Sequence, residues 1–168
     1  MELEERVAEL ERRLAALEGA GAGGGHVRPQ DADFWALEGL KAKLAENEVA
    51  HGGVLFTGMV RLPTNELYEW QQALPTDALL DENWSDAAES FAALGHSVRM
   101  RLLREILGGR RTVAELTALD GLGTTGQVYH HLRQLISAGW LHSTGRGGYE
   151  VPPGRVVPLL VVLAASRP

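Results

Sequence analysis

The chain contains no cysteine among its 168 residues. Without a thiol it can form no disulfide framework, no thiolate metal site and no cysteine nucleophile. Long apolar runs are also missing, because the longest, residues 156–165, has ten residues and includes Pro158, whereas a membrane-spanning helix needs about 20. The first six residues carry three glutamates and no apolar run, which argues against a secretory signal. These absences predict a cytoplasmic protein without a membrane partner.

Aromatic residues are scarce, at 6% of the chain, but 45% hydrophobic and 23% charged residues are typical of a globular protein. The net charge of −6 is distributed unevenly. Residues 1–90 hold 7 Lys and Arg against 18 Asp and Glu, a net charge of −11, whereas residues 91–168 hold 9 against 4, a net charge of +5. This asymmetry favours a basic functional half carried by an acidic half, with chance scatter as the alternative.

Residues 1–18 have apolar side chains at the 3.5-residue period of a coiled coil. Leucine at the d positions favours a parallel dimer, and arginines at g can pair with glutamates at e on the partner chain. The alternative is a short amphipathic helix that packs on its own domain. The residues predicted to form this dimer seam are Leu3, Val7, Leu10, Leu14 and Leu17.

Residues 19–30 contain five glycines and a proline, which predicts a flexible linker. Residues 31–80 then predict a helix followed by a β-hairpin, with strands at 54–62 and 67–72 and a turn at 63–66. Most of the aromatic side chains fall in or near this segment. We interpret them as a small core or dimer-stabilising module, or alternatively as a pocket for a small-molecule effector. They are Phe34, Trp35, Phe56, Tyr68, Trp70 and Trp84.

Residues 81–168 predict a series of helices that ends in a second hairpin. Helices are expected at 86–94 and 97–107. Thr112 and Thr124 each precede Glu or Gln by three residues, the pattern of a capping box at a helix start. Two strand-like segments, 140–144 and 149–151, flank a glycine-rich tip. This order of elements is that of a winged helix.

Two short helices joined by a tight turn can place the second helix in the DNA major groove while the first crosses the backbone. Gln127 can make a bidentate contact to adenine, and Arg133 can bind a guanine edge or a phosphate. A solvated face on an unrelated helical domain is the alternative. The predicted DNA-binding residues are Thr124, Thr125, Gln127, Tyr129, His130, Arg133 and, at the hairpin tip, Arg146.

The segments ALGHSVRMRLL, TVAEL, QVYHHLRQL and AGWL occur in this order within residues 85–151. In this respect the chain resembles the ArsR-type winged-helix regulators of bacteria. The resemblance implies a homodimeric transcription factor with a recognition helix starting at Thr124, Arg146 in the wing, and terminal helices at the dimer interface. The apolar last helix would then pack against the helix from Asp86 of the partner. Its predicted interface residues are Leu159, Leu160 and Leu163.

Two departures from that family argue against metal sensing. Its metal-sensing members use cysteines on the first helix of the pair, or carboxylates and histidines on the last helix, and this chain has neither. His130 and His131 are neighbours that diverge by about 100° on a helix, so we expect one to face DNA and one to pack inside. His96 is expected to form a structural hydrogen bond near a helix start. We predict no metal, no cofactor and no catalytic residue.

The predicted fold is mainly α with small β-hairpins (α+β). It has a coiled coil (1–18), a linker (19–30), a helix and hairpin module (31–80) and a winged helix-turn-helix domain (81–168). The predicted function is a cytoplasmic, nucleoid-associated homodimer that regulates transcription from a palindromic site in double-stranded DNA, and the resemblance implies repression rather than activation. Two alternatives stay open: a protein-interaction scaffold that no longer binds DNA, and a ligand-gated sensor with an aromatic pocket in residues 31–80.

Overall fold

The computed structural model describes residues 34–145 and 147–167. By compactness the chain divides into two units, Met1–Trp35 and Ala36–Pro168. The predicted coiled coil, the predicted linker and Arg146 therefore lie outside the described residues. The description below concerns the second unit.

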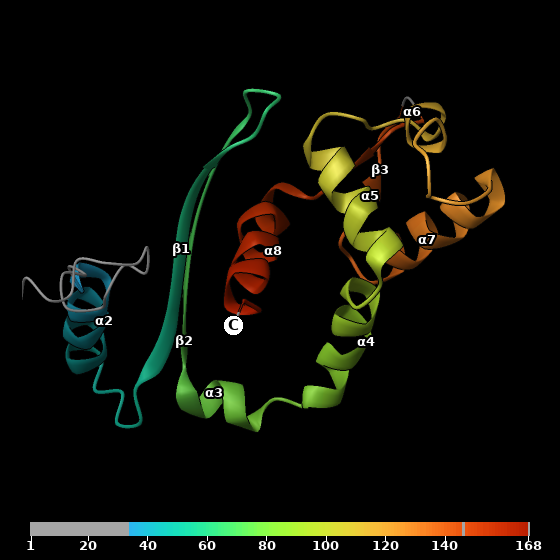
Figure 1. The fold of residues 1–168 in the computed structure, drawn as a ribbon. Helices are drawn as coiled ribbons and strands as arrows, with labels where there is room; N and C mark the ends of the chain where they lie inside the picture. Colours follow the sequence, from blue (N-terminus) through green and yellow to red (C-terminus); the bar gives the residue numbers. More distant parts are fainter. Residues whose placement is uncertain (1–33, 146, 168) are drawn as a thin grey trace, which may run out of the picture. The chain divides into compact units, whose positions relative to one another are not determined.

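The described residues form a mixed α/β fold with seven helices and two antiparallel hairpins. No described helix is both long and apolar enough to cross a membrane. In chain order (Figure 1) the elements are α2 (Trp35–Glu46), β1 (Gly53–Arg61), β2 (Leu67–Pro75), α3 (Thr76–Asp81), α4 (Trp84–Leu94), α5 (Ser97–Leu107), α6 (Val113–Thr117), α7 (Thr125–Ser137), β3 (His142–Ser143), β4 (Tyr149–Glu150) and α8 (Pro153–Ala165).

The long hairpin β1–β2 confirms the strands and the turn predicted from the sequence. Its register pairs Val60 with Tyr68 and Gly58 with Trp70. Directly opposed residues project to the same face of a sheet, so these four share one face, as the period-two pattern predicted. Asn65 adopts a positive φ of 71° in the turn, a conformation that asparagine tolerates better than most residues. The second strand continues to Pro75, three residues past the predicted end.

Helix α8 packs against this face of its own hairpin (Figure 1). A Cβ on Gly58 would lie 2.7 Å from Val157 Cγ1, and one on Gly154 would lie 3.4 Å from the Trp70 ring. The sequence predicted instead that the last helix packs against the helix from Asp86 of a second chain. Leu159 in particular is only 1% exposed within the single chain, so the predicted role of this residue at a dimer interface needs correction.

The hydrophobic core joins the helices to the tip of the long hairpin. Leu62 at the end of β1 belongs to the same buried cluster as α5, α7 and α8. The boundary predicted at residue 80 is therefore not a domain boundary, because residues on both sides of it contribute to one core. The side chains that are at most 1% exposed are Leu102, Leu103, Ile106, Leu116, Val128, Leu132, Leu135, Val156, Val157 and Leu159.

Local capping explains where several helices begin. The side chain of Asn83 accepts the Ser85 N–H and caps α4. His96 Nδ1 accepts the Val98 N–H at 3.2 Å and caps α5, which confirms the structural hydrogen bond predicted for this histidine. Helix α3 was not predicted. Its six residues are too few for a periodic pattern.

Candidate nucleic-acid interface

Helix α7 begins with the capping box that the sequence predicted at Thr124. The Thr124 hydroxyl accepts the Gln127 N–H at 3.4 Å, and Gln127 Oε1 accepts the Thr124 N–H at 2.8 Å. Two N–H groups that have no partner within a helix are thereby satisfied. The direction of α7 relative to the preceding turn is therefore held by a reciprocal pair of hydrogen bonds.

The inner face of α7 is fully buried, as predicted, because Val128, Leu132 and Leu135 are 0% exposed. The predicted DNA-binding residues of this helix accordingly project toward solvent on the remaining surface. Tyr129 is 40% exposed. The other exposed members of the set are Thr124, Thr125, Gln127, His130 and Arg133.

Gln127 has a structural role that limits its predicted role in reading bases. Its amide oxygen already accepts the Thr124 N–H and lies against Gly123, where an added Cβ would meet it. A bidentate adenine contact uses the oxygen and the NH2 group of one amide together. Only the NH2 group and the second lone pair of the oxygen are free for it while the cap is in place.

Arg133 has no ion-pair or hydrogen-bond partner among the described residues. Most other arginines of the basic half bind within the chain. The Arg99 guanidinium donates to the Ala92 and Ala93 carbonyls, and Arg101 donates to the Asp120 carbonyl at 2.6 Å. Fewer guanidinium groups of this half are therefore free to donate to a ligand than its net charge of +5 suggests.

Two further arginines illustrate the same point. Arg155 lies over the Trp140 ring at 4.9 Å, and Arg110 pairs with Glu105. Both guanidinium groups serve internal contacts. On α7 itself, Arg133 is the only lysine or arginine, so it is the cation that this helix offers to a phosphate or a base edge.

The short hairpin β3–β4 is attached to the start of α6. Thr112 forms an isolated bridge with Gly148, and the Tyr149 N–H donates to the Arg111 carbonyl at 2.7 Å. Thr112 also caps α6 through a complete capping box with Glu115. Arg111 and Thr112, the two residues before α6, therefore hold the base of the hairpin, and Thr112 also starts the helix. Arg146 at its tip lies outside the described residues.

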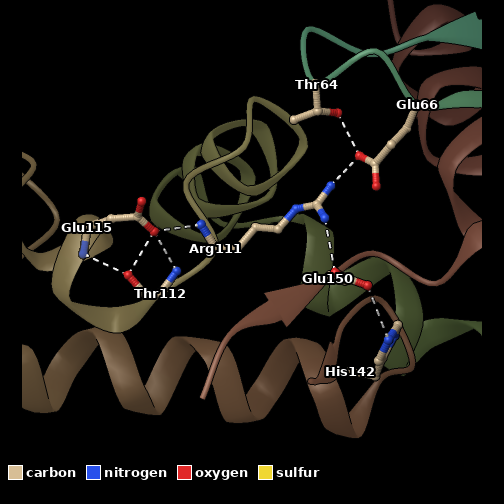
Figure 2. Close-up of polar contacts among 7 residues, drawn as sticks. All are labelled: Thr64, Glu66, Arg111, Thr112, Glu115, His142 and Glu150. Atoms are coloured by element: carbon tan, nitrogen blue, oxygen red, sulfur yellow. Dashed lines mark hydrogen bonds and ion pairs between the residues drawn. The ribbon is translucent and has the colours of Figure 1, made fainter. Parts of the chain in front are cut away.

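A polar network around Arg111 links the two hairpins, and the sequence analysis missed it (Figure 2). The Arg111 guanidinium pairs with Glu66 at the tip of the long hairpin and with Glu150 on β4 at 3.0 Å. Glu66 also accepts a hydrogen bond from Thr64 at 2.6 Å. His142 on β3 lies 3.8 Å from Glu150. These residues are up to 86 positions apart in sequence, and no local pattern relates them.

This network affects the ionisation of its members. The hydrogen bond from Thr64, together with the Arg111 guanidinium, holds the pKa of Glu66 below its ordinary value. Burial, together with the Glu66 charge, raises the pKa of Tyr68. Both effects favour a charged Glu66 and a neutral Tyr68 at physiological pH. Arg111 Nε is buried without a hydrogen-bond partner among the described residues.

One of the paired histidines packs against the chain, as the sequence predicted, and the other is exposed. His130 is exposed, whereas His131 is half-buried against His96, with ring centroids 4.7 Å apart. Burial, and then the nearby His96 and Arg99, lower the pKa of His131. Its Nδ1 atom is buried and has no hydrogen-bond partner among the described residues.

No metal cluster is found in the described part of the chain, and a groove found there is not aromatic. No three His, Asp or Glu side chains within residues 34–145 and 147–167 are grouped to hold a metal ion. A groove of about 300 Å³ lies between α4 and α7 and is lined by Arg99, Gln134 and Glu89 together with alanines and a serine. The aromatic side chains at Trp70 and Trp84 are 40% and 69% exposed and do not line it.

No protein-family model matches this chain, and a comparison with curated proteins finds no match.

Proposed function

We propose that this chain is a sequence-specific DNA-binding transcriptional regulator that acts as a homodimer on a palindromic operator. The observation that carries the proposal is the exposed face of α7. This face presents Thr125, His130 and Arg133 on a helix whose opposite side is fully buried. Hydroxyl, imidazole and guanidinium groups are the types that contact phosphates and base edges in the major groove.

The surrounding elements support a winged helix-turn-helix. Helix α6 packs on α7, and the two are joined by a short turn in which Gly121 and Gly123 adopt positive φ angles. The β3–β4 hairpin follows α7 and is anchored beside α6. This is the order in which a bracing helix, a recognition helix and a wing occur. Repression is proposed in preference to activation on the family resemblance alone.

Selection of bound fragments from random and genomic DNA tests the proposal directly. We expect an enriched inverted repeat, because a twofold dimer places two copies of α7 on two half-sites about one helical turn apart. Enrichment of a motif would also identify the operator. Failure of a folded, dimeric protein to enrich any motif would contradict sequence-specific DNA binding.

Arg133→Ala is the most direct test of DNA binding by the exposed face of α7. If Arg133 binds a phosphate, its loss should weaken binding to the operator and to scrambled duplex alike, and reduce the slope of log affinity against log salt by about 1. Lys43→Ala is the matched control, because it removes one exposed cation from α2, where Lys43 pairs with Glu46. The control should bind DNA like the parent. Equal effects of the two variants would exclude a specific role for Arg133.

Two substitutions at Gln127 distinguish its role in capping α7 from a role in contacting bases. Gln127→Ala removes both, whereas Gln127→Glu keeps a side-chain oxygen that can accept the Thr124 N–H and removes the NH2 donor. We expect thermal unfolding to detect a loss only in the alanine variant. We expect operator binding to fall in both variants, with relaxed preference at one base pair. Unchanged binding by Gln127→Glu would limit Gln127 to capping.

The homodimer is supported by exposed apolar side chains. Trp84 and Phe91 lie seven residues apart on one face of α4 and are 69% and 62% exposed, and Leu80 on α3 is 63% exposed. Isolated exposed apolar residues are ordinary, but a stripe of large ones marks an interaction surface. On α8, Leu160 is half-buried and Leu163 is 37% exposed, so both remain candidates for the interface.

The same apolar stripe also favours the second candidate function, a scaffold that holds a different protein through α3 and α4. Sedimentation of the purified chain distinguishes the two. A stable dimer in which Trp84 and Phe91 become protected from solvent supports the regulator. A monomer that selects no DNA sequence supports the scaffold.

A further inference from the structure

We propose that a second copy of this chain pairs with the free edge of β1, so that two long hairpins form one four-stranded antiparallel sheet with its twofold axis at Thr57. This inference rests on the homodimer proposed above and specifies its interface. It concerns a surface for which the family resemblance provides no expectation, since that resemblance does not extend to the long hairpin.

The first observation is that β1 is an edge strand without the usual protection. In the described residues the long hairpin has only two strands, each of nine residues. A two-stranded hairpin is at best marginally stable by itself, and an edge strand exposes unpaired N–H and C=O groups along its length. Apart from β2, the main contacts of β1 are with α8 and α3. Helix α8 approaches a face of the strand at Gly58, and β2 is the only strand paired with β1 among the described residues.

The second observation is the composition of β1. Proteins protect edges with lysine, proline or inward-pointing charges, and the segment GVLFTGMV contains none of these before Arg61. Two of its apolar side chains are largely exposed, since Val54 is 55% and Met59 is 73% exposed. The strand β2 differs, because it carries Glu69 within it and ends at Pro75. Edge pairing is therefore favoured at β1 and disfavoured at β2.

The third observation is that β1 is complementary to itself about Thr57. An antiparallel pair centred there places Thr57 opposite Thr57 of the second copy. Leu55 then lies opposite Met59, and Val54 lies opposite Val60. Aliphatic and threonine pairs of this kind stabilise antiparallel strands, and the pairing brings no like charges together.

Glycine 58 completes this pattern. Within one chain Gly58 is opposite Trp70, and in the proposed pairing its other neighbour would be Phe56 of the second copy. An aromatic ring across from a glycine covers the backbone that the glycine leaves exposed. The proposed sheet would also bring the two α8 helices, each packed under its own hairpin, onto the same face.

Because the chain contains no cysteine, a single introduced cysteine provides the only thiol for cross-linking. Thr57→Cys introduces one thiol at the proposed axis, and directly opposed residues in an antiparallel pair are close enough for a disulfide. Gln71→Cys is the matched control, because Gln71 is the β2 residue opposite Thr57 in the same hairpin and is similarly exposed. Under mild oxidation of the full chain we expect Thr57→Cys to form a covalent dimer about tenfold faster than Gln71→Cys.

A second pair of variants measures the noncovalent dimer. Thr57→Lys places two like charges opposite each other at the axis, so its dimer should dissociate at lower concentration than that of Gln71→Lys. Circular dichroism verifies that each variant is folded. If the parent is a dimer but the two cysteine variants cross-link equally well, or neither of them cross-links, the β1 pairing is overturned while the dimer and DNA binding are left in place. A parent that is monomeric at all concentrations would overturn both the pairing and the dimer. Selective cross-linking at Thr57 without enrichment of a DNA motif would support the pairing and contradict the regulator.

Discussion

Arg111 illustrates how one side chain can connect parts of the chain that are distant in sequence. Its side chain is 26% exposed and contacts carboxylates on the tip of the long hairpin and on β4. Its backbone carbonyl accepts the Tyr149 N–H, and its own N–H donates to Glu115. Side chain and backbone together therefore fix the position of the short hairpin relative to α6.

Arg111→Ala should lower the free energy of unfolding by about 1–2 kcal/mol, because charge-assisted hydrogen bonds are lost and two carboxylates remain without their cation. Arg104→Ala is the control, since Arg104 also pairs with a glutamate but is 77% exposed, and it should change stability by less than about 0.5 kcal/mol. Urea unfolding of both variants measures the difference. Equal losses would indicate that the network contributes no more than a surface ion pair.

The lowered pKa of His131 predicts that the stability of the protein depends on pH. Burial lowers its pKa in the folded protein from the ordinary value of 6.5, so below about pH 6.5 the unfolded chain binds a proton that the folded chain does not. Stability should therefore fall as the pH decreases from 7 toward 5. His131→Gln should flatten this part of the profile. A parent whose stability is constant between pH 7 and 5 would contradict the prediction.

At the scale of elements, the packing of α8 on the long hairpin requires a residue without a side chain at position 58. The helix has apolar residues on several sides, and three of them, Val156, Val157 and Leu159, are buried in the single chain. The close contact at Gly58 explains why the strand tolerates a glycine that would otherwise weaken it.

Gly58→Ala should destabilise the protein by about 1–3 kcal/mol, because the added methyl group would overlap the Val157 side chain. Gly39→Ala is the control. An added Cβ at Gly39 on α2 meets nothing within 4 Å, and the substitution should stabilise that helix by up to about 1 kcal/mol. Thermal unfolding of both variants measures the two changes in stability, which should have opposite signs. Full stability of Gly58→Ala would contradict the observed approach of α8.

At the scale of the whole molecule, two separate surfaces are proposed to hold the dimer. One is the predicted coiled coil, and the other is formed by the β1 edge and the exposed apolar side chains of α3 and α4. Deletion of residues 1–18 should weaken the dimer without abolishing it, because the second surface remains. Sedimentation at several concentrations measures the change. A monomer after deletion would assign dimerisation to the coil alone.

The local features of this fold could be predicted from sequence because the interactions that produce them span few residues. The capping boxes at Thr112 and Thr124 join positions three apart, and the turn after Leu62 is closed within five residues. The buried stripe of α7 follows from its helical period. In each case a short segment contains both partners of the interaction, so its pattern specifies the structure.

Only the tertiary structure decided which surfaces are free. The sequence identified Gln127 and the basic residues as DNA-binding candidates, but the fold engages Gln127 in a cap and most of the arginines in internal contacts. It likewise buries Leu159 in the core of the single chain and leaves Trp84 exposed. These outcomes depend on contacts between segments that are far apart in the chain, where side-chain volume, charge and the lengths of the connections act together, and no local pattern contains that information.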